Sequence, residues 1–399
     1  MSRFAHLDGL RGVAALMVVF VHYMGAFYPF TLFGDAPDYI QHTLWERSVF
    51  YPPLGTLVAA HMAVCLFFII SGYVLTYKFL GDRLPVGEVV LLCLKRPIRL
   101  GGLVWVSLVV GGLFWACGLY QQEALARIAG SNPWALGFWN GPFDLHQFIK
   151  DFFFAPFSHG DRYNAVLWTI KYELYGSFQL FAFLLFFSGW KYRLIPAMIL
   201  LYLSMHSLYQ GFWIGLIFAD LEKFYFSRVC VSRRVKAPLL GLLWCLFLFI
   251  GGYPNYVTAE FIQNTVYAWL PSDQGFKGGY PMLSAVLLFF LVFRASYCRK
   301  ILTSRPLLHL GWLSYGVYIC HLIVIFSFSS ALFIILESSL GYHFAFLSSI
   351  IAGSYVVYIC AYLMVRYVDR PLVQALQVCS IYIRRECAVR YKNYKSRSR

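Results

Sequence analysis

Two arginines lie one helical turn apart in the segment KRPIRL, and their spacing suits the binding of an anion. Arg96 and Arg99 are three residues apart, so a helix presents both side chains on one face. Two neighbouring guanidinium groups repel each other unless an anion lies between them, and the planar fork of Arg matches a phosphate group. The pair therefore indicates either a phosphate-bearing ligand or contact with lipid headgroups.

A histidine deep in the first apolar segment is the strongest candidate for proton chemistry. In LDGLRGVAALMVVFVHY, His22 follows Arg11 by eleven residues, which is about 16 Å along a helix axis. Imidazole is the side chain that exchanges protons most readily near neutral pH. His22 is therefore either a general base or a core histidine that is hydrogen-bonded to a neighbouring helix.

A carboxylate in a later apolar segment needs a partner. The sequence LWTIKYELYGSF begins close to Trp168 and carries Lys171 and Glu173 into a predicted span. Residues two apart point to different faces of a helix, so Glu173 needs an Arg or His from another helix, or else a proton. Glu173 is thus either part of an active site or one half of a structural ion pair, and we consider Trp168 a candidate site-lining residue.

Three further polar residues are candidates for lining the same site. Ser71 precedes Gly72 in FFIISGYVL, where small residues also allow helices to approach closely. Tyr315 and His321 belong to a polar stripe in LGWLSYGVYICHLIV that lines either a site or an internal hydrogen-bond network.

Motifs of several common enzyme classes are missing from the sequence. There is no serine-hydrolase elbow, no P-loop, no dinucleotide-binding glycine pattern and no zincin spacing. The ten cysteines form no CxxC pair, and six of them lie in or beside apolar runs, as small buried hydrophobes do. We therefore expect no metal site and no permanently bound cofactor.

The composition identifies the kind of fold that must position these residues. Of the 399 residues, 60% are hydrophobic, 20% are aromatic and only 13% are charged, against roughly 25% charged in soluble proteins. This excludes a disordered chain, a fibrous repeat and a secreted disulfide scaffold. It predicts an all-α, polytopic membrane protein.

Apolar runs of spanning length predict about ten transmembrane helices. The first is not followed by a signal-peptide cleavage site, so we expect it to be retained. The predicted spans cover residues 10–29, 57–79, 98–119, 165–187, 193–205, 209–226, 238–253, 282–297, 308–336 and 344–368.

The distribution of Lys and Arg predicts the sidedness of these spans. With ten helices, 27 of the 33 basic residues fall on the side of the termini and five on the other side. The positive-inside rule then makes both termini cytoplasmic. Aromatic segments 31–56 and 121–163 face out, and the basic tail, residues 376–399, is expected to contact anionic lipid headgroups rather than nucleic acid.

Taken together, the motifs resemble those of the acyltransferase-3 family, membrane proteins that O-acylate extracytoplasmic glycans and similar acceptors. The first-helix pattern with Arg11 and His22 is similar to that of the family, as are FFIISGYVL, the RPIR pair, LWTIKYE, LGWLSYGVYICH and VDRPL. The resemblance covers residues 1–375. Ile170 and Asp369 depart conservatively from the usual Leu and Glu, and the LYGSF segment after Glu173 also departs from the family pattern.

The resemblance implies a cytoplasmic acyl-CoA donor, with acetyl-CoA as the first expectation, and a hydroxyl acceptor on an extracytoplasmic glycan. Arg11, Arg96 and Arg99 would hold the donor phosphates. His22 would act as general base or as acyl carrier, and Glu173 would orient His22 or pair with an arginine. Tyr315 or His321 would polarise the carbonyl.

The resemblance also implies an integral protein of the cell (inner) membrane, if the source is bacterial, with components of a polysaccharide assembly pathway as partners. Two other classes of function remain open from the residues alone. A proton-coupled transporter or polysaccharide exporter would use His22 and Glu173 as a relay, although many transporters contain repeats that this sequence lacks. A structural or lipid-scrambling protein would need neither residue for catalysis.

Overall fold

The computed structural model describes residues 4–154, 157, 160–225, 233–271 and 278–397, and these residues form a bundle of helices without strands. The predicted all-α fold is confirmed. Each predicted span falls on a helix: α1 (Ala5–Phe27), α3 (Ala60–Tyr77), α4 (Val86–Ala116), α8 (Trp168–Phe187), α9 (Leu194–Leu203), α10 (Gln210–Phe224), α11 (Arg233–Gly251), α13 (Gly279–Arg294), α15 (Arg305–Val324) and α17 (Tyr342–Met364).

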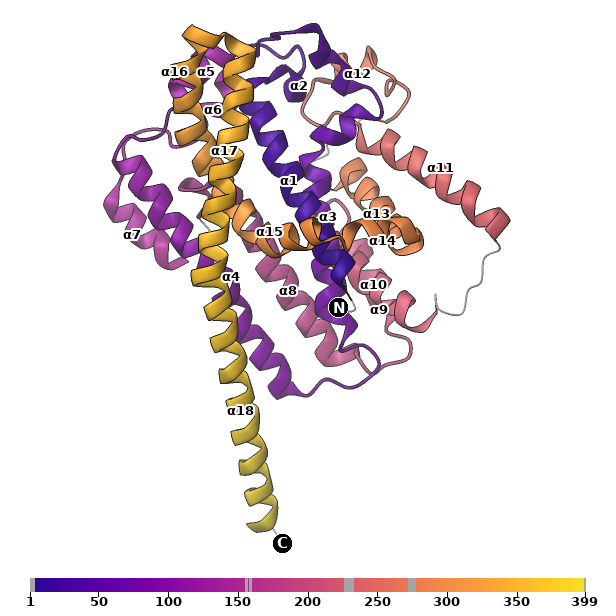
Figure 1. The fold of residues 1–399 in the computed structure, drawn as a ribbon. Helices are drawn as coiled ribbons and strands as arrows, with labels where there is room; N and C mark the ends of the chain where they lie inside the picture. The colour runs from indigo at the N-terminus through magenta and orange to yellow at the C-terminus, as the bar shows by residue number, and fades with distance from the viewer. Residues whose placement is uncertain (1–3, 155–156, 158–159, 226–232, 272–277, 398–399) are drawn as a thin grey trace.

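Shorter elements join or extend these helices (Figure 1). π-helical turns connect α15 to α16 and α17 to α18, so each pair forms one long helix. The shorter elements are α2 (Phe30–Phe33), η1 (Leu44–Phe50), η2 (Leu54–Val58), α5 (Gln122–Ala129), α6 (Asn132–Ala135), α7 (Leu145–Phe154), η3 (Gly160–Arg162), η4 (Ala165–Leu167), α12 (Ala259–Gln263), α14 (Ser296–Leu302), η6 (Ile325–Ser329), α16 (Ser330–Leu340), η7 (Val365–Asp369) and α18 (Arg370–Arg397).

The protein is polytopic by the length and composition of its helices. Among the described residues, five helices are long and apolar enough to cross a membrane: Ala5–Phe27, Ala60–Tyr77, Val86–Ala116, Arg305–Leu340 and Tyr342–Glu386. The bent pair α13–α14, with a 94° angle, adds a sixth. The other predicted spans coincide with helices that are shorter or, in α8, carry charged residues, so the total of ten stays a prediction.

The start of α4 differs from the prediction. The helix begins at Val86 rather than at residue 98, so Arg96 and Arg99 lie in its interior and Pro97 is an internal proline. The boundary was placed where continuous hydropathy begins, whereas the preceding residues, with Glu88 and Lys95 among apolar neighbours, form a half-exposed stretch of the same helix.

Two close helix contacts hold the centre of the bundle together. In Figure 1, α1 and α3 lie in the middle, with α15 crossing beside them. Gly311 of α15 lies so close to the backbone of Asp8 in α1 that a Cβ atom would overlap it. Gly72 of α3 lies equally close to the backbone of Phe212 in α10. Small residues at these crossings bring the polar side chains of α1, α3, α8 and α15 together.

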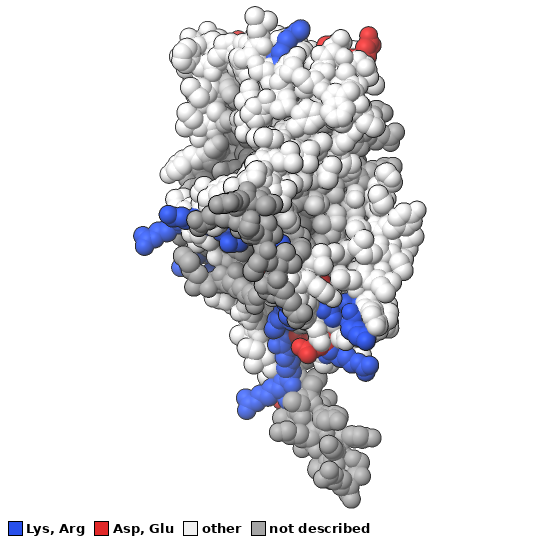
Figure 2. All heavy atoms as spheres, turned by 90° about the vertical axis from the view of Figure 1, so that its right-hand side faces the viewer, with Lys and Arg blue, Asp and Glu red and all other residues white. Residues whose placement is uncertain are grey.

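Charged side chains are unevenly distributed along the bundle. On the face shown in Figure 2, the upper part is nearly all uncharged and most Lys and Arg lie lower down, toward the end from which α18 projects. This agrees with the predicted excess of basic residues on one side. The predicted basic tail, 376–399, continues α18 as far as Arg397.

Candidate active site

A large cavity lies between α1, α3, α4, α8 and α15. It has a volume of about 610 Å³, and six of the predicted site residues line it: Arg11, Ser71, Arg96, Arg99, Glu173 and Tyr315. Asp369 of η7 is a further charged residue of its wall. Phe67, Phe68 and Val74 of α3 form much of its apolar wall. The cavity thus offers both charged groups and a surface for an apolar chain.

Glu173 has its partner on another helix. Arg96 of α4 forms an ion pair with Glu173 of α8, and their side chains are only 11% and 15% exposed. The Ser71 hydroxyl donates a hydrogen bond of 2.6 Å to the same carboxylate oxygen. Arg96 Nε also donates to the Ser177 hydroxyl, at 2.9 Å. Of the two roles expected for Glu173, the structure shows the pairing with an arginine.

Arg99 and Arg11 present more accessible guanidinium groups to the cavity. Arg11 is 29% exposed and lies 3.7 Å from Asp8, which is itself 48% exposed. Arg99 is exposed, and no carboxylate among the described residues is within salt-bridge distance of it. Because Glu173 already neutralises Arg96, Arg99 is the arginine of the predicted pair that remains available to an anion.

His22 lies next to His321. The Nδ1 atom of His22 is 2.7 Å from the carbonyl oxygen of Val18 and 3.2 Å from Nε2 of His321. His321 is fully buried, and its Nδ1 is 2.8 Å from the carbonyl oxygen of Tyr318. Since a carbonyl accepts only, each Nδ1 carries a hydrogen, and the single Nδ1–H of His22 is shared between the Val18 carbonyl and His321 Nε2.

This arrangement leaves the other ring nitrogen of His22 available. No hydrogen-bond partner of His22 Nε2 occurs among the described residues, and His22 is partly exposed. The unprotonated Nε2 is therefore a base, and the contacts of Nδ1 with Val18 and His321 fix the orientation of its ring.

The histidine pair adjoins the inner cavity through Tyr318. Tyr318 and Thr169 both line the cavity, and their hydroxyl oxygens are 2.9 Å apart. The ring centroids of Tyr318 and His321 are 6.0 Å apart, one turn along α15. On its other side His22 faces Trp134 of α6, with ring centroids 6.0 Å apart. His22 therefore lies between the cavity and the segment predicted to face out.

Tyr315 lines the cavity, but its hydroxyl is not free, and Trp168 lies outside the lining. The Tyr315 hydroxyl donates to the carbonyl of Leu100 at 2.6 Å, so its proton is engaged with α4. Trp168 does not line the cavity; its ring packs edge-on against Tyr172, with centroids 5.9 Å apart. Within the described part of the chain, no group of three metal-ligating side chains converges.

Sequence reasoning missed Asp8, Thr169 and Trp134. Asp8 could have been found from its spacing, because it lies three residues before Arg11. The sequence around Thr169 and Trp134 gives no such signal. Each belongs to the site because it contacts a residue more than a hundred positions away, Tyr318 and His22 respectively.

Comparisons with known proteins identify the family of the chain. Residues 4–366 match the acyltransferase-3 family, described as an acyltransferase domain. Acyltransferase clz18 of Cochliobolus lunatus is 24% identical, with 82% of this chain and 84% of that protein covered. Acyltransferase R4 of a Phoma species is 23% identical, with 83% and 85% covered.

A bacterial relative matches most of this chain with about half of its own length. The protein named "Putative O-acetyltransferase SACOL0978" of Staphylococcus aureus is 25% identical, over 80% of this chain and 50% of that protein. No solved structure matches the chain significantly.

Proposed function

Because the chain belongs to the acyltransferase-3 family and is a membrane-embedded acyltransferase, we propose that it moves an acetyl group from acetyl-CoA to a hydroxyl of a glycan. The donor enters from the predicted cytoplasmic side, and the acceptor from the opposite side. The acceptor is a polysaccharide or glycolipid, so we also propose that the protein acts beside a polysaccharide assembly pathway, in the cell membrane.

The observation that carries this proposal is the position of His22. Its free Nε2 lies between an arginine-lined cavity and an aromatic outer segment, and its Nδ1 is fixed by Val18 and His321. A base that removes a proton from a hydroxyl must be held in this way, with one nitrogen oriented and the other free.

In the proposed reaction, His22 takes up one proton and later returns it. His22 Nε2 takes the proton of the acceptor hydroxyl while the oxygen attacks the thioester carbonyl. The carbon–sulfur bond then breaks, and the CoA thiolate takes the proton back from the imidazolium. During the step His321 Nε2 accepts from His22 Nδ1 and stabilises the positive charge. Direct attack of Nε2 on the thioester, with His22 as acyl carrier, would use the same free atom.

The donor is assigned to the inner cavity on the basis of its chemistry. Arg99 and Arg11 offer guanidinium groups for the phosphates of CoA, and the apolar wall of α3 suits the pantetheine arm. Arg96, which is bound to Glu173 and Ser177, fixes the approach of α4 to α8. No permanently bound cofactor is needed for this chemistry.

The test is acceptor-dependent release of CoA from labelled acetyl-CoA by the purified protein in liposomes, with glycan fractions as acceptors. We expect release and labelled glycan with the wild type, and a loss of about 100-fold or more in H22A. H309A is the matched control, because His309 is an exposed histidine of α15 that contacts Tyr358 and lies outside the cavity lining. Transport of glycan without CoA release would support the exporter instead.

A further inference from the structure

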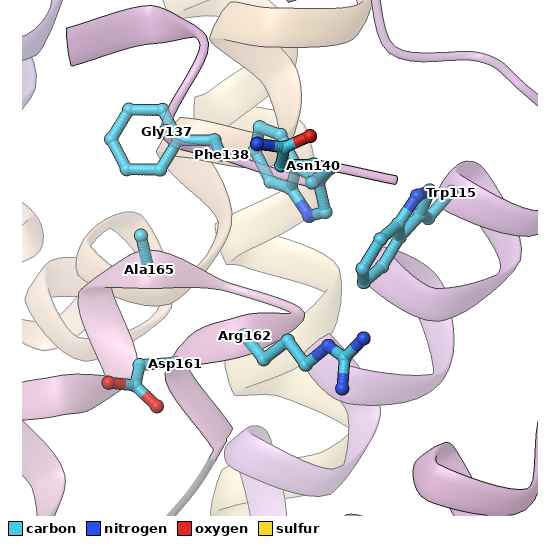
Figure 3. A pocket seen from close by; sticks show the side chains of 8 residues that line it. Trp115, Gly137, Phe138, Asn140, Asp161, Arg162 and Ala165 are labelled. Carbon is cyan, nitrogen blue, oxygen red and sulfur yellow. The ribbon is translucent and has the colours of Figure 1, made fainter. Parts of the chain in front are cut away.

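A second pocket lies outside the inner cavity, where three separate segments meet. It has a volume of about 190 Å³ and is lined by the end of α4, the loop after α6, and the segment η3–η4 that leads into α8. Figure 3 shows Trp115 and Asn140 facing one another across it, with Arg162 below Trp115 and the Asp161 carboxylate directed away. Its lining combines aromatic faces with side chains that bind hydroxyl groups.

The aromatic walls of this pocket are fixed in place. Trp115 Nε1 donates to the carbonyl of Gly141 at 3.1 Å. Trp139 Nε1 donates to the carbonyl of Tyr163 at 3.0 Å, and its ring stacks on Tyr120 with centroids 3.8 Å apart. Rings that are held rigidly before binding lose little conformational entropy when a ligand stacks on them.

The backbone at Trp139 has an uncommon conformation. Its φ angle is +47°, in the left-handed region that bulky residues rarely occupy. The Trp139 side chain is only 5% exposed, because Tyr120, Phe138 and Phe326 surround it. The next residue, Asn140, is exposed and lines the pocket.

Aromatic contacts connect this pocket to His22. Phe138, which lines the pocket, packs edge-on against Trp134 with centroids 5.0 Å apart. Trp134 in turn lies 6.0 Å from the ring of His22. The wall of the pocket is therefore connected to the proposed base through the rings of Phe138 and Trp134.

The charges around the pocket favour a neutral ligand. Arg162 stacks over Trp115, with its guanidinium carbon 5.6 Å from the ring centroid. Asp161 lines the same pocket. The backbone N–H of Gln147 holds the pKa of nearby Asp144 below its usual value, with a smaller contribution from Arg162, so Asp144 is ionised at neutral pH. The Asp144 carboxylate offsets the charge of Arg162, so an anion gains little there.

We propose that the pocket of Trp115, Trp139, Asn140, Asp161 and Arg162 is a subsite for a neutral pyranose ring of the acceptor glycan. The apolar face of the sugar stacks on Trp115, and its vicinal hydroxyls bind Asn140 and Arg162. Assigning this sugar to the acceptor rests on the proposed function, whereas binding of the sugar does not. A subsite connected to His22 through Phe138 and Trp134 holds one sugar unit while another unit of the same glycan is acylated.

The test is equilibrium binding without an acyl donor. Saturation-transfer NMR on the full chain in nanodiscs is recorded with neutral tetrasaccharides, such as maltotetraose, cellotetraose and mannotetraose, and with the anionic tetramer of galacturonic acid. We expect signal transfer to the ring protons of at least one neutral sugar and about tenfold weaker binding in W115A, which corresponds to about 1.4 kcal/mol. R162A, at an exposed position, should weaken binding without affecting folding.

The matched control is W269A, because Trp269 is 73% exposed and lies outside the pocket. It should bind the sugar as the wild type does. Equal binding by W115A, R162A and the wild type, or binding of the anionic tetramer alone, would overturn the subsite. Pocket-dependent binding by a wild-type protein that transfers no acetyl group would overturn the proposed function and leave the subsite in place.

Discussion

His321 Nε2 lies 3.2 Å from His22 Nδ1, so the nitrogen that orients the proposed base comes from another helix. The contact exists because α1 and α15 approach closely at Gly311. His321 itself is directed by the carbonyl of Tyr318. The chain of contacts from Tyr318 to His321 to His22 sets the ring orientation of the base, as the third member of a catalytic triad does for its histidine.

We predict that His321→Ala lowers kcat by about 10-fold to 100-fold and changes the KM for the donor little. The physical reason is that His321 positions His22 and does not contact the donor. His321→Gln, whose side-chain oxygen can still accept from His22 Nδ1, should recover part of kcat. A parallel rise in the KM of the donor, with no recovery in the Gln variant, would indicate general damage to the bundle instead.

The ion pair of Arg96 and Glu173 leads to a stability prediction. Glu173→Ala leaves a guanidinium buried without its carboxylate, which costs about 3 kcal/mol or more. We expect a clear fall in the thermal unfolding midpoint in detergent. The double variant R96A/E173A should be more stable than E173A alone, because it removes the unpaired charge. If the loss of stability in the double variant equalled the sum of the losses in R96A and E173A, the two residues would not be coupled.

Binding of the donor should depend on Arg99 more than on Arg96, because Glu173 already neutralises Arg96. We predict that Arg99→Ala weakens binding of acetyl-CoA by about tenfold, and that Arg99→Lys restores only part of the affinity because the bidentate geometry is lost. Calorimetry with CoA measures both. Lys171→Ala is the control, since Lys171 lies on α8 outside the cavity lining and contacts the ring of Tyr172. Unchanged affinity in R99A would return this arginine to a role in lipid contact.

The close helix crossing can be tested apart from the chemistry. A Cβ atom at Gly311 would overlap the Asp8 backbone, so G311A should lose most of the folded, membrane-inserted protein. At Gly87 of α4 nothing lies within 4 Å of the added atom, and G87A should fold as the wild type does. Fluorescence-detected size exclusion measures both variants. Normal folding of G311A would mean that α1 and α15 lie farther apart.

The sequence predicted the helices and most of the inner site because these depend on local patterns. Hydropathy located the spans, and charges inside apolar runs pointed to Arg96, Glu173 and His22. The start of α4 could not be located in this way, because its first three turns are half-exposed. The partners of Glu173 and His22 were also not predictable, since Arg96 and His321 reach them only after the helices pack.

The outer pocket was even less accessible to sequence reasoning. An aromatic outer segment, 121–163, was predicted, but Trp115 was assigned to a span. The contact of its ring with Arg162 depends on how α4 ends and how the chain returns to α8. Trp115 and Arg162 are 47 positions apart, and no sequence pattern predicts a contact between them.

The last prediction concerns sidedness, on which the two-sided mechanism depends. Single cysteines at Asp35 and Leu145, both exposed and both in predicted outer segments, should react with a membrane-impermeant maleimide in intact cells. One at Gly87, exposed on the predicted inner side, should react only after lysis. The cysteines that are exposed among the described residues, Cys117, Cys245 and Cys379, are replaced first, together with Cys230 and Cys387. Gly34 is a poorer outer position than Asp35, because its φ of +62° strains any side chain. If Gly87 alone reacted in intact cells, the arginines of the cavity would face away from cytoplasmic acetyl-CoA, and the donor could not enter as proposed.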